Sequence, residues 1–175
     1  MRLRLPIFGL ALATAAVAAS AWAHPPVPGV VRQTGGNIVA GPQPAADVER
    51  DPHTNFILRC SGCHGVTGVG APLAGIPTFP DVVGVFAGDD DGRTYLFHVP
   101  GIVSASLSNR EIAGVMNYVM EAWAGRSLPA DFVPFTEEEV TMRRAIPVED
   151  VVAFRRAIVE RLAAQGLVAA DYPWP

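Results

Sequence analysis

Cys60-Ser61-Gly62-Cys63-His64 is the stretch of sequence that decides how the rest of this chain is interpreted. Two thiols separated by two residues and followed at once by an imidazole are typical of a covalent c-type haem attachment site. Both cysteines can add to the vinyl groups on one edge of a porphyrin, and a neutral histidine nitrogen can then ligate the iron. We therefore predict one haem c per chain, bound covalently by Cys60 and Cys63, with His64 as the proximal iron ligand.

Two other uses of such a motif fit this chain less well. A redox dithiol normally opens a helix within a strand–helix–strand unit, and no such pattern surrounds the motif. A structural zinc site needs four nitrogen or sulphur ligands, whereas the chain has two cysteines and four scattered histidines. Covalent haem remains the interpretation that uses all three side chains.

The N-terminus has the pattern of an export signal. Two arginines precede an apolar run over residues 7–19, and residues 21–23 form a small-x-small cleavage site. The apolar run is shorter than the roughly 20 residues that a transmembrane helix needs. We therefore predict a cleaved signal peptide at residues 1–23, a mature chain beginning at His24 and a periplasmic location. An uncleaved membrane anchor is the alternative.

The charge of the chain limits the partners that it can have. The 175 residues carry a formal net charge of −4, all 13 basic residues are arginines, and no lysine is present. Removing the two arginines of the leader leaves 11 arginines against 17 acidic residues, a net charge of −6. An acidic, lysine-free surface argues against nucleic acids and anionic membranes as partners, and we expect no membrane span after cleavage.

The chain divides into four predicted parts, and the fold class is mainly α. They are the signal peptide (1–23), a Pro/Gly-rich linker (24–50), a haem domain (51–125) and a helical C-terminal extension (126–175). In the extension, residues 136–166 have helical spacing in two pieces broken at Pro147. We expect this apolar arm to pack on the haem domain. Its removal after Gly125 should then lower stability and leave the haem spectrum nearly unchanged.

Two helices are predicted within the haem domain, separated by a loop-rich segment. The first begins at Asp51 or Pro52 and ends near Cys60, since proline suits an early helical position. The second begins at Ser108, which forms a capping box with Glu111. Its apolar residues follow a buried helical face: Ile112, Val115, Met116, Val119, Met120 and Trp123, with Gly125 placed to end the helix.

This arrangement resembles the class I cytochromes c. The matching residues are Phe56 with the cysteine–histidine motif, and the segment from Leu107 to Ile112 leading into Asn117-Tyr118-Val119. The resemblance covers residues 51–123 and implies two helices that cross nearly at right angles, with Phe56 against Tyr118. It also implies a loop-rich haem pocket that includes Phe56, Tyr95 and Ile102.

A narrower similarity concerns the expected partner. Residues 92–101 and 131–136 resemble small exported cytochromes of bacteria that oxidise amines or alcohols. This similarity implies a periplasmic redox protein as partner, such as a quinoprotein dehydrogenase or another cytochrome. It carries no catalytic residue with it.

The resemblance also implies a proline carbonyl that orients the proximal histidine. A ligating histidine usually donates its second ring N–H to such a carbonyl. Pro72 lies nearer the position expected in the family, and Pro77 is the alternative. Both prolines are equally compatible with a purely loop-shaping role.

The distal side departs from the family pattern. The position expected for a methionine ligand is Ile102, and no methionine occurs between His64 and Met116. His98 could ligate the iron from a strand-like run, or the iron could be five-coordinate in an apolar pocket around Ile102 and Val103. Met116 and Met120 are weaker alternatives, because their spacing favours core packing and hence no methionine–iron bond.

Two charged clusters complete the prediction. Asp89-Asp90-Asp91 is expected to be a solvated acidic loop, since glycines flank it. Five arginines of the extension could lie on the haem domain, approach a haem propionate or form a solvated helix face: Arg143, Arg144, Arg155, Arg156 and Arg161.

Single-electron transfer is the function that the sequence favours. A covalent haem in a small domain without another catalytic constellation points to a carrier rather than an enzyme, which receives electrons from a dehydrogenase or cytochrome and passes them to an oxidase. The alternative is a gas sensor or peroxidase-like enzyme with an open distal iron site. Peroxidase chemistry needs a polar distal group, and His98 is the available one.

Overall fold

The computed structural model describes residues 49–172. The predicted signal peptide (1–23) and all but the last two residues of the predicted linker (24–50) lie outside the described residues. The described residues are mainly helical, as predicted, with no strand and one isolated bridge between Ala71 and Ile76. In chain order the helices are α1 (Pro52–Arg59), α2 (Ser61–His64), η1 (Pro72–Ala74), η2 (Val83–Gly88), α3 (Asp90–Leu96), α4 (Pro100–Val103), α5 (Asn109–Val119), η3 (Met120–Ala124), η4 (Gly125–Ser127), α6 (Glu137–Arg144) and α7 (Val151–Ala164).

The two helices predicted for the haem domain are confirmed as α1 and α5. The Asp51 carboxylate caps α1 by accepting a hydrogen bond from the Thr54 N–H at 2.9 Å. Ser108 caps α5 and forms the predicted capping box with Glu111. The helix continues through the π-helical turn η3 until Gly125, whose φ of +49° breaks the helical path.

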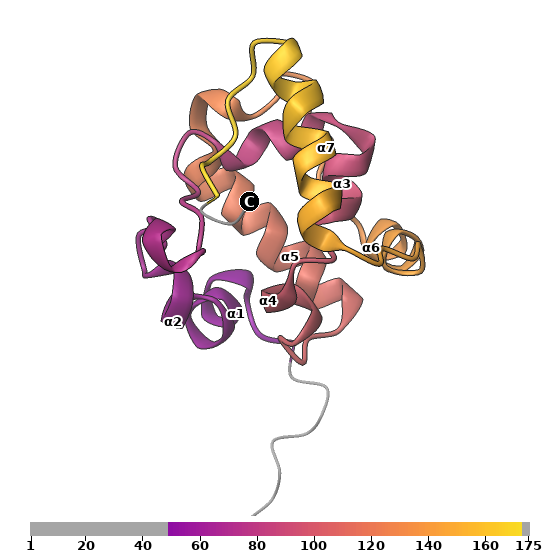
Figure 1. Ribbon diagram of the computed structural model, residues 1–175. Coiled ribbons are helices and arrows are strands. Elements are labelled where there is room, and N and C mark those ends of the chain that lie inside the picture. Colours follow the sequence, from indigo (N-terminus) through magenta and orange to yellow (C-terminus); the bar gives the residue numbers. More distant parts are fainter. Residues whose placement is uncertain (1–48, 173–175) are drawn as a thin grey trace, which may run out of the picture. The chain divides into compact units, whose positions relative to one another are not determined.

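The contact between α1 and α5 is aromatic. The Phe56 side chain is fully buried, and its ring centroid lies 5.7 Å from that of Tyr118 and 4.7 Å from that of Trp123. The helices approach closely at Gly114, where a Cβ would meet Pro52 Cγ at 3.2 Å. The expected pairing of Phe56 with Tyr118 is therefore confirmed, and α5 is fixed against the helix that leads into the motif (Figure 1).

The segment between these helices contains more helix than predicted. The run from Tyr95 to Val99, which suggested a strand, lies in and just after α3. The reason is a local cap: the Asp89 carboxylate accepts a hydrogen bond from the Gly92 N–H at 2.8 Å and starts the helix. A Cβ at Gly92 would collide with the Phe86 carbonyl, so η2 and α3 pack together at this glycine.

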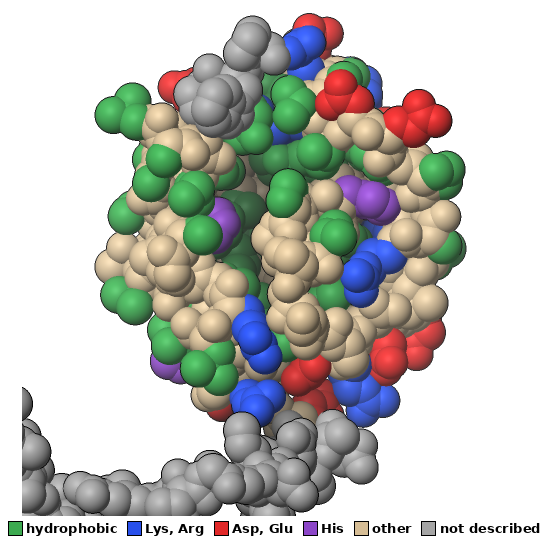
Figure 2. Space-filling model, turned by 60° about the horizontal axis from the view of Figure 1, so that its bottom comes forward, with side chains coloured by type: hydrophobic (Ala, Val, Ile, Leu, Met, Phe, Trp, Pro, Cys, Tyr) green, Lys and Arg blue, Asp and Glu red, His purple; other side chains and the backbone are tan. Residues whose placement is uncertain are grey.

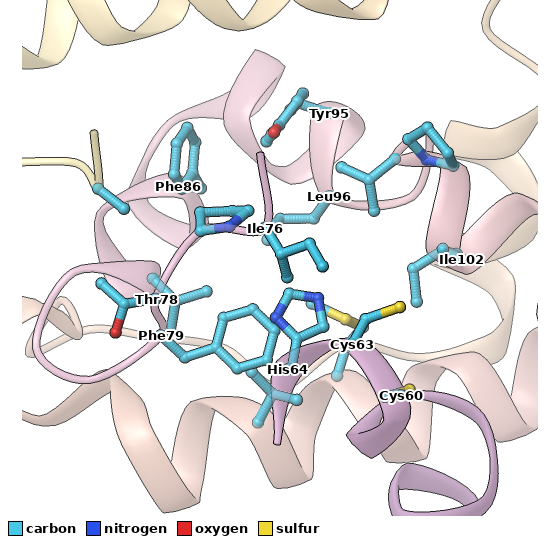
Figure 3. A pocket seen from close by; sticks show the side chains of 18 of the residues that line it. Cys60, Cys63, His64, Ile76, Thr78, Phe79, Phe86, Tyr95, Leu96 and Ile102 are labelled. Carbon is cyan, nitrogen blue, oxygen red and sulfur yellow. The ribbon is translucent and has the colours of Figure 1, made fainter. Parts of the chain in front are cut away.

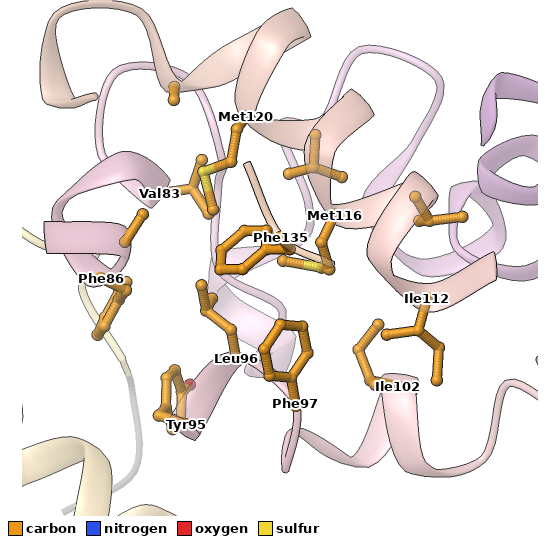
Figure 4. Close-up of a cluster of buried hydrophobic side chains, with 14 of the residues drawn as sticks. Val83, Phe86, Tyr95, Leu96, Phe97, Ile102, Ile112, Met116, Met120 and Phe135 are labelled. Atoms are coloured by element: carbon orange, nitrogen blue, oxygen red, sulfur yellow. The ribbon is translucent and has the colours of Figure 1, made fainter. Parts of the chain in front are cut away.

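The extension forms two helices on either side of Pro147, as predicted. Helix α6 contacts α5, and α7 lies alongside α3 (Figure 1). Val140, Ile158 and Leu162 are each at most 1% exposed. They belong to the same hydrophobic core as α3 and α5, part of which Figure 4 shows.

The prediction of a solvated loop at Asp89-Asp90-Asp91 is wrong, because arginines of the extension pair with all three carboxylates. Arg161 Nη2 lies 3.0 Å from an Asp89 oxygen and 2.8 Å from an Asp91 oxygen. Arg143 Nη2 lies 2.7 Å from an Asp90 oxygen. Two of the five arginines therefore connect the extension to α3.

The helices of residues 49–172 were also compared with the length and hydropathy of membrane spans. No helix in this part of the chain is long and apolar enough to cross a bilayer.

Candidate functional site

An apolar cavity of about 300 Å³ opens beside the cysteine–histidine motif. The space-filling view shows the surface hollowed, with hydrophobic side chains in the walls of the hollow (Figure 2). The walls come from both predicted parts of the chain: α1 and α2, the segment 75–83, α3, the segment 99–102, α5, the start of α7 and the segment 170–172.

Two successive tight turns bring the three motif side chains to this cavity. Helix α1 ends as the Cys60 N–H donates to the Phe56 carbonyl at 2.8 Å. The Cys60 carbonyl then accepts hydrogen bonds from the N–H groups of Cys63 and His64, at 3.1 and 3.0 Å. Both thiols are free, and burial together with the neighbouring Cys63 raises the pKa of Cys60.

The His64 ring points into the cavity beside Phe79 (Figure 3). The two rings are stacked, with centroids 4.1 Å apart. Burial lowers the pKa of His64, and the backbone carbonyl of Pro77 acts in the opposite direction. The net effect favours the neutral imidazole, which is the form that ligates metals. The Nδ1 atom is buried without a hydrogen bond of ordinary geometry.

The structure favours Pro77 over Pro72 as the proline on the proximal side. Pro72 is exposed in η1 and does not line the cavity, and its carbonyl already accepts the Gly75 N–H at 3.0 Å. Pro77 lines the cavity because the chain turns back at Gly70, which has a φ of +65°. A Cβ on Gly70 would lie about 2.5 Å from the Ile76 carbonyl oxygen and 2.6 Å from that of Pro77.

The other predicted pocket residues line the cavity. Phe56, Tyr95 and Ile102 are all in its walls and are at most 7% exposed. Figure 3 shows Leu96 and Ile102 on one side, away from Phe79. The wall at Ile102 is therefore apolar, as its sequence predicts.

His98 is not placed to ligate iron in this cavity. It follows α3 and lies outside the cavity walls. Its Nδ1 lies 2.8 Å from the Thr94 carbonyl, and its Nε2 lies 2.9 Å from the Ile146 carbonyl. The strand-like interpretation misled the prediction, because a helical path turns this side chain toward the extension.

The two methionines of the last helix differ in position. Met120 is 1% exposed and does not line the cavity, so it belongs to the core. Met116 is 6% exposed and does line the cavity. The structure therefore reverses the predicted order of the distal candidates, placing Met116 ahead of His98.

Sequence reasoning missed the part of the wall supplied by the extension. Val151, Val152, Arg155 and Tyr172 line the cavity although they follow the motif by more than 80 residues. Val151 and Arg155 are four residues apart and so share a helix face. That spacing marks a face, but it does not say which surface the face covers.

The residues of the cavity fit a haem. The walls are largely apolar, as a macrocycle requires, and both thiols and the imidazole meet at one end. The buried Nδ1 of His64 has no partner other than the nearby Pro77 carbonyl, which suits a ring whose second nitrogen is taken by a metal. The donor set is thus that of a covalently bound haem with a histidine ligand.

Comparisons with known proteins agree with this fit. No protein-family model matches the chain. Cytochrome c-552 of Thermus thermophilus is 32% identical over 120 residues, which cover 57% of this chain and 91% of that protein. A second cytochrome c-552, from another record of the same species, is also 32% identical over 120 residues, covering 57% of this chain and 80% of that protein. The similarity extends over most of the length of both relatives.

Proposed function

The chain belongs to the cytochrome c family, and on this premise we propose that it is a periplasmic, class I, mono-haem electron carrier. The observation that carries the proposal is the turn that brings Cys60, Cys63 and His64 together at one apolar cavity. Cys60 and Cys63 hold the haem through thioethers, and His64 is its proximal ligand. The haem supplies a reversible one-electron change at iron.

The protein's own part is to hold, shield and orient. The apolar walls exclude water and lower the local dielectric, which is one of the levers that set a haem potential. Pro77 orients the imidazole of His64. Cys63 is exposed, so the attached edge of the haem lies at the surface, where a redox partner can approach.

The partner and location follow the expectations of the sequence. The partner is a periplasmic redox protein, such as a quinoprotein dehydrogenase or another cytochrome. The surface next to the motif is apolar rather than charged, since Val66, Val69 and Leu73 are 68, 53 and 99% exposed. A lysine-free chain with this surface recognises its partner mainly by shape and apolar contact.

Met116 is the proposed sixth ligand of the iron. Among the described cavity residues it is the one methionine, and His98 is engaged elsewhere. A six-coordinate, low-spin iron suits rapid electron transfer. The alternative function, gas binding at an open iron, is supported by the apolar wall around Ile102. A peroxidase loses its support, because His98 does not face the cavity.

Optical spectra of two matched variants test the function and separate it from the alternative. We expect a low-spin wild-type protein whose haem undergoes a reversible one-electron titration and exchanges electrons with a second cytochrome. Met116→Leu should become high-spin and bind carbon monoxide when reduced, while Met120→Leu should keep the wild-type spectrum. A high-spin wild-type protein that binds carbon monoxide and does not exchange electrons would favour the gas-binding alternative.

A further inference from the structure

Two arginines of the extension are buried, and their surroundings differ sharply. Arg143 is 8% exposed and Arg155 is 7% exposed. Arg143 is fully paired: it contacts carboxylate oxygens of Asp90 and Glu139, each at 2.7 Å, and donates to the Thr94 hydroxyl at 2.9 Å. It therefore shows how this protein compensates a buried guanidinium when its own carboxylates are available.

Arg155 has no such compensation within residues 49–172. None of the ion pairs in this part of the chain includes it. Its Nη2 donates to the Ala170 carbonyl, and its Nε atom is buried without a partner. Its guanidinium lies over two rings, 5.7 Å from the centroid of Phe86 and 4.9 Å from that of Tyr172.

A buried, unpaired guanidinium is costly. It cannot release its proton, so it cannot escape burial by becoming neutral. Aromatic faces and one carbonyl offset part of the lost hydration, but a buried charge normally has an opposite charge as its partner. Since Arg155 lines the cavity, an anionic group inside the cavity can complete its surroundings.

The position of Arg155 within the cavity narrows the choice of anion. Figure 3 shows Phe86 and Tyr95 on the side of the cavity away from Cys60 and Cys63. Arg155 is on this side, because it lies over Phe86 and its charge opposes the rise in the pKa of Tyr95 that burial causes. The vinyl and propionate groups of haem lie on opposite edges, so a haem held by its vinyl edge at the cysteines directs its carboxylates toward this side.

We propose that Arg155, with Tyr95 and Tyr172 beside it, is the site that binds a haem propionate, so that the C-terminal extension closes the cavity and sets the haem potential. The proposal rests on the proposed function, because it requires a haem attached at the motif. It assigns the extension a redox role in addition to its contribution to the core. Arg59, which also lines the cavity, is exposed and needs no such partner.

The potential should respond to Arg155 because its positive charge favours the reduced iron and keeps the propionate ionised. A unit charge acting over about 12 Å at an effective dielectric constant of about 20 changes an equilibrium by about tenfold. For a one-electron couple this corresponds to a shift of about 59 mV. Loss of Arg155 should therefore lower the potential by up to this amount, less whatever the newly protonated propionate restores.

The experiment compares Arg155→Met, Arg155→Lys and the exposed neighbour Arg156→Met as full-length proteins with attached haem. Potentials are measured from pH 5 to pH 8, and resonance Raman spectra record the propionate bending mode. We expect Arg155→Met to have a lower potential, a shifted propionate mode and a new pH dependence as the carboxyl titrates. Arg155→Lys should retain most of the wild-type potential, and Arg156→Met should match the wild type.

Two outcomes would overturn the proposal while leaving the proposed function intact. One is a Raman propionate mode unchanged in Arg155→Met; the other is a potential no lower than that of Arg156→Met. A wild-type protein without attached haem would instead refute the proposed function itself. If Arg155→Met fails to fold, Arg155→Lys decides the matter, because a point charge without the guanidinium fork should still shift the propionate mode.

Discussion

Replacing Ile158 by alanine tests whether the C-terminal extension is part of the same folding unit as the haem domain. Ile158 is 0% exposed on α7 and belongs to the shared core. The change removes three carbons, worth about 2.4 kcal/mol at about 0.8 kcal/mol per buried methylene. The cavity left behind adds a further penalty, so we expect a loss of about 3 kcal/mol in the free energy of unfolding.

The assay is guanidinium denaturation of the haem-bearing protein, followed by far-ultraviolet circular dichroism and by haem absorbance. Ile146→Ala is the matched control, because it makes the same change in the same extension at a side chain that is 43% exposed. It should lose less than about 1 kcal/mol. The two probes should give the same midpoint for each variant. Equal losses in both variants, or a helical transition separate from the haem transition, would refute a shared core.

Three further predictions concern acid stability, the turn at the proximal side and the extension. Burial acts to raise the pKa of Glu139, but hydrogen bonds from Arg93 and Arg143 lower it overall, so its stabilisation is present above the unfolded-state pKa and lost as the pH falls through the folded-state pKa. Acid titrations should therefore show a smaller loss of stability in Glu139→Gln; an unchanged slope would contradict this. Gly70→Ala should cost about 1–3 kcal/mol in denaturant titrations and disturb the haem spectrum, because of its positive φ and the Pro77 carbonyl, while Gly62→Ala, with open space around it, should be nearly neutral. Deleting residues 126–175 should lower the melting temperature and alter the haem spectrum; an unaltered spectrum would mean that α7 is not needed as a wall of the cavity.

The last expectation corrects the one drawn from sequence alone. Apolar spacing in the extension indicated a buried face, and the face is buried. Helical periodicity does not specify which surface a face covers, so it could not show that α7 supplies Arg155 to the haem cavity. The spectrum is therefore expected to depend on the extension, contrary to the sequence-based prediction.

Features with a local physical cause were predictable. The caps at Asp51 and Ser108, the end of the helix at Gly125 and the break at Pro147 each depend on residues within a few positions of one another. The covalent motif is local in the same sense.

Features set by tertiary contact were not predictable. His98 follows a β-like run of side chains, yet the Asp89 cap makes the segment helical and turns the imidazole toward Ile146. Pro77 rather than Pro72 lines the cavity because Gly70 turns the chain back on itself. In each case the deciding contact joins residues whose proximity the sequence does not encode by spacing.

A haem held covalently by Cys60 and Cys63, with His64 as its ligand, is the feature on which every other inference depends. The most direct measurement is the intact mass of the denatured protein after acid extraction, from cells that carry the c-type haem attachment machinery. We predict a mass increased by one haem in the wild type and its loss when both cysteines are replaced by alanine. A wild-type protein that is folded, stable and without haem would contradict this assignment.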